Sequence, residues 1–362
     1  MKRIRIVTVT CWAITAIALI GLAVWFLTGS LFGYHTDGWL SGMASGLNWE
    51  ILTGPYEIVG EYSIPASGLD SLYVDWTAGE VTVRPWDGED IHISEYAQRD
   101  LQDDEILYYN ISDGLLTIKY CETNSIFRNM PIKRIYVLIP HELSVGMARF
   151  TVDTSSAAID VSNISTPAFK ADAVSGAVRL SNISAQVFNA STTSGSLTIS
   201  SVNADSIKLD SVSGIINAQN AIAVTFDSST TSGSQTLSGL FERSDLDSIS
   251  GRITFDSSAM ASVVRADTTS GGIDISGFIE SAEINSISGG VSVRSGIVPS
   301  SLSVGTTSGG ITVAVPNEGA ISVSYSSISG KLSSDIPIIT QGSGAQFNLS
   351  TTSGNAKIQA LG

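Results

Sequence analysis

The chain has 362 residues, of which 19 are Lys or Arg and 34 are Asp or Glu, so its formal net charge is −15. This acidic balance argues against nucleic-acid binding, which needs a basic surface, and against broad docking on anionic lipid. Only 15% of the residues are charged and 34 are glycine, and the many Ser, Thr, Val and Ile residues indicate packed β structure rather than disorder.

An uncharged apolar run at residues 6–27 follows the basic residues Lys2, Arg3 and Arg5. As a helix it would span ~33 Å, which matches a hydrocarbon core of ~30 Å. No Lys or Arg follows before Arg84, so the positive-inside rule predicts a cytoplasmic stub at 1–5, a single transmembrane anchor at 6–27 and an extracellular remainder. A cleaved signal peptide is the alternative interpretation of the same run.

Three regions are expected after the anchor. Residues 28–68 are rich in Gly, Ser and aromatic residues with little periodicity, which indicates a juxtamembrane linker. Alternating apolar and polar residues begin at Leu69, and several such runs bounded by Gly or Pro predict a β cap region at 69–145. Repeats are expected over 146–362, and no amphipathic helix is expected after the anchor.

A Ser-Gly turn recurs throughout the third region. Its glycines are Gly176, Gly195, Gly214, Gly233, Gly251, Gly271, Gly289, Gly309, Gly330 and Gly354. Up to Gly330 the steps between them stay close to a fixed period of about 20 residues, which is typical of a solenoid. Apolar residues two and four places after most glycines, and a second alternation later in each unit, predict two short strands per unit. Glycine suits such turns where φ is positive.

The turns alternate between two turn sequences, Thr-Thr-Ser-Gly and Ser-Ile-Ser-Gly or a close variant. Like residues stabilise one another in neighbouring strands. A coil of about 38 residues would therefore stack each turn sequence in a column of its own, whereas a coil of about 19 residues would alternate the two turn sequences in one column. Both lengths can close, and column purity favours 38.

An N-terminal anchor followed by repeated units of the form x-Ser-Gly-x-Val-x-Val-Ser resembles the bacterial putative-adhesin family of toastrack domains (DUF4097). The resemblance covers roughly residues 69–358. It implies an all-β, elongated β-solenoid (β-helix-like) domain outside the cytoplasm, often in membrane or envelope-stress proteins. It supplies no catalytic residue.

Candidate chemistry is sparse. His35, His92 and His141 all precede the repeats, and the sequence has no Gly-x-Ser-x-Gly elbow, so a serine hydrolase is disfavoured. Cys11 and Cys121 lie far apart, and neither a disulfide nor a zinc site is expected.

Weak metal candidates are three acids that stand four residues before a turn glycine, Asp172, Asp210 and Asp247. In a 38-residue coil they would stack ~4.8 Å apart, where a Ca²⁺ ion would relieve their repulsion. Turn hydrogen bonding by these aspartates is the favoured interpretation. No catalytic residue, cofactor or firm metal ligand is therefore expected.

These observations predict a membrane-anchored surface module that binds or supports without catalysis. Its expected partners are the membrane, through residues 6–27, and an envelope or surface protein or polysaccharide, with no nucleic acid. An envelope-stress accessory protein that binds a membrane partner is the alternative, and a surface hydrolase is a third.

Overall fold

The computed structural model describes residues 55–122, 130–319, 321–339 and 344–361. Nearly all of them belong to one compact unit made of Thr53–Glu122 and Ile132–Gly362. The predicted anchor at 6–27 lies outside the described residues. Within the described ranges, no helix is long and apolar enough to cross a bilayer.

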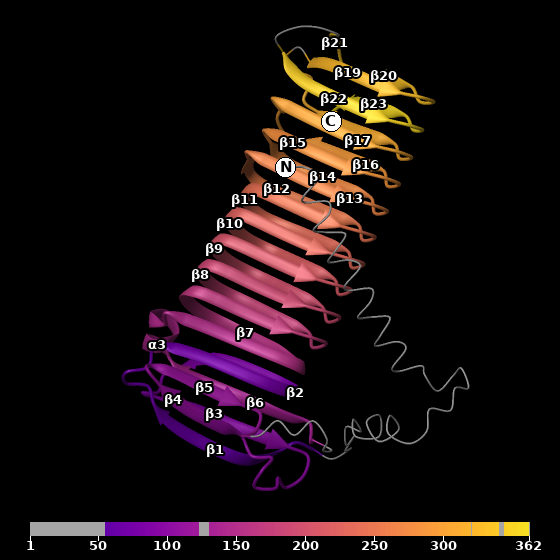
Figure 1. The fold of residues 1–362 in the computed structure, drawn as a ribbon. Helices are drawn as coiled ribbons and strands as arrows, with labels where there is room; N and C mark the ends of the chain where they lie inside the picture. The colour runs from indigo at the N-terminus through magenta and orange to yellow at the C-terminus, as the bar shows by residue number, and fades with distance from the viewer. Residues whose placement is uncertain (1–54, 123–129, 320, 340–343, 362) are drawn as a thin grey trace, which may run out of the picture. The chain divides into compact units, whose positions relative to one another are not determined.

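The described residues form 23 strands and one short helix, all strands belonging to one sheet (Figure 1). The N-terminal elements are β1 Glu57–Pro65, β2 Ser71–Trp86, β3 Asp90–Ala97, β4 Tyr108–Ser112, β5 Leu115–Lys119, β6 Lys133–Pro140 and α3 His141–Gly146. The repeats are β7 Arg149–Ala173, β8 Val178–Thr192, β9 Leu197–Ser211, β10 Ile216–Thr230, β11 Gln235–Ser248, β12 Ile253–Ala261, β13 Val263–Thr268, β14 Ile273–Ile279, β15 Ser281–Ser286, β16 Val291–Ser295, β17 Ser301–Thr306, β18 Ile311–Val315, β19 Ile321–Ser327, β20 Leu332–Ser334, β21 Ile338–Ile339, β22 Ala345–Thr351 and β23 Ala356–Ala360.

One coil of the solenoid contains about 19 residues, which is the separation of Asn163 and Asn182 on neighbouring coils. Successive coils pair in parallel, in columns such as Ile159, Val178, Leu197 and Ile216. Gly233 lies directly between Gly214 and Gly251 in one column, because a Cβ on Gly233 would touch Gly214 O and a Cβ on Gly251 would touch Gly233 O. The preference for the 38-residue coil was therefore wrong, and the two turn sequences alternate along a single edge of the solenoid.

Each coil turns at two places. At one turn, Asn163, Asn182, Ser201 and Asn220 adopt φ between 52° and 60°, a conformation that Asn tolerates better than most residues. The first two also stack, and Asn182 Nδ2 donates to Asn163 Oδ1 at 3.1 Å. In β7–β11 the chain passes this corner within one continuous strand, whereas the coils from β12 onward divide into the two strands that the sequence predicts.

The turn glycines occupy the other edge, but not because of positive φ. Among the described glycines, φ is positive only at Gly68, Gly79, Gly114, Gly277 and Gly319, none of which belongs to the Ser-Gly series. A Cβ on any glycine of that series would lie 1.7 to 2.2 Å from a carbonyl oxygen of the neighbouring coil. Glycine is therefore required by the close approach of two backbones, which corrects the conformational reason expected from the sequence.

Buried hydroxyls hold these turns. Three residues before the glycine, Ser and Thr alternate in successive coils, and their Oγ accepts the glycine N–H at 2.9 to 3.0 Å in the coils of Thr192, Ser211 and Thr230. Thr306 and Thr351, however, occupy adjacent coils and pair in register. Side-chain size alone therefore does not require the alternation.

The solenoid interior is filled by columns of like apolar side chains. Phe150, Phe169 and Phe188 are fully buried, and their rings stack at centroid distances of 5.2 and 5.0 Å. Val, Ile and Leu columns fill the rest of the core. Alternation between these buried residues and exposed Ser, Thr and Asp explains why each segment adopts the strand conformation.

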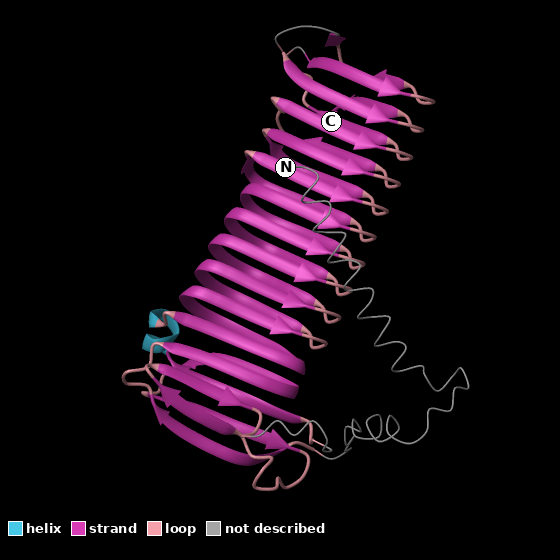
Figure 2. Cartoon of the chain, viewed as in Figure 1, coloured by secondary structure: helices cyan, strands magenta, loops and turns pink. Residues whose placement is uncertain are grey.

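Antiparallel strands close the N-terminal end (Figure 2). β2 pairs in parallel with β5 and β6 on one side and with β7 on the other, whereas β3 runs antiparallel to β6, and β1 antiparallel to β3. Two expectations are corrected here. β1 lies within the segment assigned to the linker, because pairing with β3 stabilises a stretch whose own alternation is weak. The short helix α3 follows β6, where no helix was expected.

The last coils do not stack in chain order. β22 lies between β17 and β19, and β23 between β18 and β20. The coil that comes last in the sequence is therefore inserted beneath the coil that precedes it.

Candidate binding surface

Neither described histidine is arranged for nucleophilic catalysis. His92 Nε2 lies 3.7 Å from a Glu61 carboxylate oxygen, and His141 Nε2 lies 3.3 Å from Asp87. Ser63 pairs with His92 across β1 and β3, yet its Oγ donates to Asp90 at 3.0 Å. His35 lies outside the described residues.

The candidate metal ligands Asp172, Asp210 and Asp247 do share a column, but a serine separates each from the next. In the observed coil, Ser191 lies between the first two and Ser229 between the last two, so the acids are two coils apart. In the described part of the chain, no group of three or more His, Cys, Asp or Glu residues is placed to hold a metal ion.

Side chains of neighbouring residues satisfy two of these carboxylates. Ser191 Oγ donates to Asp172 at 2.6 Å, and Ser229 Oγ donates to Asp210 at the same distance. Lys170 Nζ lies 2.5 Å from Asp172, and the hydrogen bond between them raises the pKa of the lysine. The turn amides are bound by Ser and Thr instead, so the expected aspartate turn bonding is replaced by hydrogen bonds along the sheet face.

A buried ionic cluster joins the strands of the N-terminal cap. Lys133 and Glu95 are both fully buried, and Lys133 Nζ donates to Glu95 Oε1 at 2.6 Å and to two backbone carbonyls, of Glu105 and Tyr120. The ammonium also lies 4.0 Å from the Tyr120 ring centroid. Burial lowers the pKa of Lys133, and the Glu95 carboxylate opposes that shift. Full burial leaves no room for a substrate, so we interpret the cluster as structural.

Large apolar side chains are exposed along one corner of four successive coils. They are Ile222 of β10, Leu240 of β11, Met260 of β12 and Phe278 of β14, with exposed fractions of 42%, 39%, 58% and 45%. Ile222 pairs with Leu240 and Met260 with Phe278 in the parallel register. We call these four residues the apolar stripe. In the preceding coils the same column carries Ser184 and Asn203, so the stripe begins abruptly.

Local sequence features place the stripe at the surface. The register of β12 and β14 shifts between Ser257 and Met260, and this bulge adds residues just before Met260. A Cβ on Gly239 would lie 1.9 Å from Ala221 O and 2.8 Å from Phe241 Cζ, so glycine at this position allows both the neighbouring coil and the ring of Phe241 to pack closely. Phe241 itself is buried. The coil can therefore bury one aromatic ring while it presents Leu240 to solvent.

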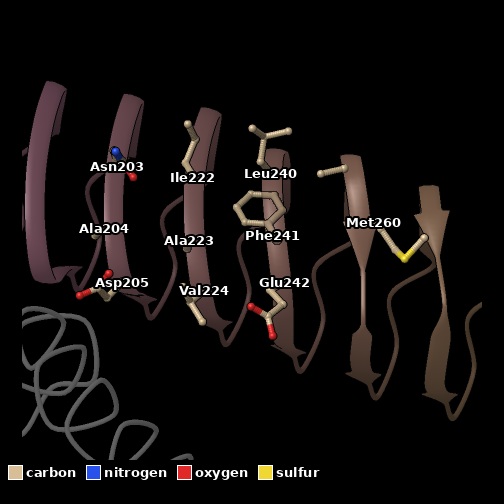
Figure 3. A pocket seen from close by; sticks show the side chains of 11 residues that line it. Asn203, Ala204, Asp205, Ile222, Ala223, Val224, Leu240, Phe241, Glu242 and Met260 are labelled. Atoms are coloured by element: carbon tan, nitrogen blue, oxygen red, sulfur yellow. The ribbon is translucent and has the colours of Figure 1, made fainter.

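The stripe borders an open hollow of about 280 Å³ (Figure 3). Ala204 and Ala223 are buried and lie in the same column as Phe241, which belongs to the next coil. Because their side chains are much smaller than the ring of Phe241, the surface is depressed at these two coils. Ile222, Leu240 and Met260 line it together with Val224, which is also exposed. The hollow has the size and lining to accept an apolar side chain from a partner.

Acidic residues flank the stripe on one side. Asp205 and Glu242 line the hollow, and Glu280 occupies the same column as Glu242, because backbone hydrogen bonds join Glu242 to Ser262 and Ala261 to Glu280 in successive coils. Arg243 lies 3.9 Å from Glu242, and both side chains are at least half exposed. In the described part of the chain, neither Asp205 nor Glu280 has a cationic partner within ion-pair distance.

Sequence reasoning missed this surface. Its signal was a column that changes from Ser184 and Asn203 to Ile222 and Leu240, which is visible only when the chain is written in the observed coils. An exposed apolar cluster rimmed by polar groups is a common mark of an interaction site.

Among solved structures, the chain resembles several bacterial proteins. One is a "putative lipid binding protein" from Parabacteroides distasonis, with 15% identity, a TM-score of 0.36 and coverage of 84% of this chain and 97% of that one. A "putative adhesin" from the same species has 11% identity, a TM-score of 0.36 and coverage of 85% and 98%. A "putative adhesin" from Parabacteroides merdae has 10% identity, a TM-score of 0.29 and coverage of 86% and 98%. At these scores the likenesses carry no argument about function.

No curated protein matches the chain. The family comparison is decisive, because the family described as Toastrack DUF4097 matches residues 69–233 and 218–360, which together cover most of the chain and nearly all of the described strands. The chain therefore belongs to the toastrack DUF4097 family.

Proposed function

We propose that this protein is a membrane-anchored surface module that binds a partner without catalysis. The anchor is the apolar run at 6–27, which the basic residues before it orient with the N-terminus in the cytoplasm. The β-solenoid then presents its side chains outside the membrane. The observation that carries the binding role is the apolar stripe, because four large exposed apolar side chains in successive coils cost solubility unless a partner covers them.

The rest of the solenoid surface supports this assignment. The sheet face around Asp172 and Asp210 is satisfied by hydrogen bonds and ion pairs with its own lysines and serines. Such a face gains little from a partner, since its groups already have their hydrogen bonds. The stripe and its hollow instead gather several exposed apolar side chains in adjacent coils, and their burial against a partner would be favourable.

Binding of the purified full-length protein to host cells and to isolated envelopes tests the proposal. We expect the double variant Leu240→Ser/Met260→Ser to lose most of the binding. The matched control Ile287→Ser/Ile328→Ser replaces two exposed apolar residues at the turn edge and should bind like the wild type. Equal binding by both double variants would remove the stripe from the function. Crosslinking on intact cells separates a surface ligand from a neighbouring membrane protein, which is the alternative partner.

A further inference from the structure

We infer that the apolar stripe binds a cationic amphipathic helix of a partner protein. This inference rests on the proposed binding function and specifies the chemistry of the partner. It follows from the spacing of the stripe, the shape of the hollow and the charge beside both.

The spacing of the stripe suits a helix better than an extended strand. Four residues on successive coils ~4.8 Å apart span ~14 Å along the solenoid. A helix presents one apolar side chain per turn of ~5.4 Å, so three turns cover ~16 Å. An extended segment presents a side chain on one face every ~6.6 Å, so it would run ~20 Å over the same three steps and leave the stripe. Apolar residues at helical spacing therefore stay close to all four positions.

The hollow supplies an anchor point beside the stripe. Its lining by Ile222, Leu240, Met260 and Val224 around an alanine floor accepts one large aliphatic or aromatic side chain. Amphipathic helices are commonly bound in this way, with apolar residues at positions i, i+3, i+4 and i+7 inserted into a groove.

The charge beside the stripe selects the sign of the helix. Asp205, Glu242 and Glu280 lie along one side, and the whole chain carries a net charge of −15. Lys or Arg on the flank of a bound helix would lie against these carboxylates, whereas an acidic helix would be repelled. A second copy of this chain would bring the same acids to the same place, and an anionic membrane would repel them. A cationic protein segment is the occupant that the charge favours.

Synthetic peptides test the inference with the full-length protein. The first probe is an amidated 14-residue helix of Leu and Lys with Leu at i, i+4, i+7 and i+11, which places one Leu in each turn over ~16 Å. The second has the same composition in scrambled order, and the third replaces every Lys with Glu. Fluorescence anisotropy at 50 and 300 mM salt measures their binding. We expect only the first peptide to bind specifically, with an affinity that falls at the higher salt concentration.

Protein variants locate the binding site. Leu240→Ser/Met260→Ser should weaken binding of the first peptide at least tenfold, whereas Ile287→Ser/Ile328→Ser should leave it unchanged. Glu242→Gln/Glu280→Gln should weaken it severalfold and reduce its salt dependence, and Glu318→Gln, an exposed acid remote from the stripe in sequence, should not. Circular dichroism melting of each variant checks that the fold is intact.

Four results would overturn the inference. These are equal binding of the scrambled peptide, equal binding of the Glu peptide, a solution dimer that the stripe variant abolishes, and stripe-dependent pelleting with phosphatidylcholine vesicles. If the stripe variant loses cell binding but the first peptide binds neither protein, the inference fails and the proposed function stands. If cell binding does not depend on the stripe, the proposed function itself fails.

Discussion

Two neighbouring glycines offer a sharp test of how the coils are packed. A Cβ on Gly289 would lie 1.8 Å from Gly271 O, whereas a Cβ on Gly290 would have one neighbour, Gly310 O at 3.6 Å. Neither glycine has a positive φ. Gly289→Ala and Gly290→Ala therefore make the same chemical change at adjacent positions and differ only in the distance to the next coil.

The cost of Gly289→Ala follows from that distance. Real Cβ atoms essentially never approach closer than 3.0 Å, so the coils must separate by roughly 1 Å at this point. Ser288 N donates to Thr269 O at 3.0 Å and Ile287 N to Thr268 O at 3.2 Å, and neither hydrogen bond survives that movement. Two lost hydrogen bonds at ~0.5–1.5 kcal/mol each and overpacking at ~1–3 kcal/mol give a loss of about 2–6 kcal/mol. Gly290→Ala should change stability by no more than about 1 kcal/mol, toward higher stability, because alanine restricts the unfolded chain.

Urea unfolding followed by circular dichroism measures both variants against the wild type. Hydrogen exchange should show that the loss in Gly289→Ala starts in the coils around residue 289, since each coil contacts only its neighbours. A free energy of unfolding for Gly289→Ala within about 0.5 kcal/mol of the wild type, the range of an ordinary surface substitution, would refute the close-approach explanation. An equal loss in Gly290→Ala would refute it as well.

Three further predictions concern the cap and the core. Lys133→Met should cost about 3–5 kcal/mol because it leaves the buried Glu95 carboxylate without its cationic partner, and adding Glu95→Leu should recover most of that loss in a double-mutant cycle. A hydrogen bond from Arg99 lowers the pKa of Glu105. The stability that Glu105 contributes is therefore present above its unfolded pKa of ~4.3 and is lost as pH falls through its lower folded pKa. The melting temperature should fall less steeply between pH 6 and pH 3 in Glu105→Gln than in the wild type, and parallel curves for the two proteins would contradict this. Phe169→Ala should cost about 3–5 kcal/mol by opening a cavity between two stacked rings, and a cost below about 1 kcal/mol in the same urea assay would show that the aromatic column does not hold the coils together.

The period of the turns predicted a β-solenoid but did not decide the length of its coil. Glycines that are spaced by about 19 residues and lie in two alternating turn sequences fit two coil lengths equally well. Each step can be one whole coil, or it can be half of a coil twice as long. Column purity favoured the longer coil because it considered the exposed turn residues alone. The buried Phe150, Phe169 and Phe188 recur over two successive steps of 19 residues without alternation. These three residues favour the shorter coil, since core side chains stack from one coil to the next.

The role of the turn glycines could not be read from composition. Glycine is favoured both by positive φ and by close approach of another backbone, and only the position of the neighbouring carbonyl distinguishes the two. The ion pair of Lys133 and Glu95 was hidden for a related reason. Its partners are 38 residues apart in a cap whose antiparallel pairing does not follow the repeat.

The candidate binding surface depended on the coil length. In the longer coil, Ile222 and Leu240 fall on opposite sides, and each is an isolated exposed apolar residue. In the observed register they are neighbours, and with Met260 and Phe278 they form one stripe. The acids beside it were equally invisible, because their common column appears only in this register.

Photo-crosslinking on intact cells tests the central claim, that the protein binds a partner through the apolar stripe. A photoreactive amino acid in place of Met260 lies within the stripe, and the same replacement at Ile287 is the control, because the two side chains have exposed fractions of 58% and 54%. We predict a discrete crosslinked protein band from position 260 that is absent from position 287. Identical crosslinking from both positions, or none from position 260 under conditions in which the protein binds cells, would contradict the claim.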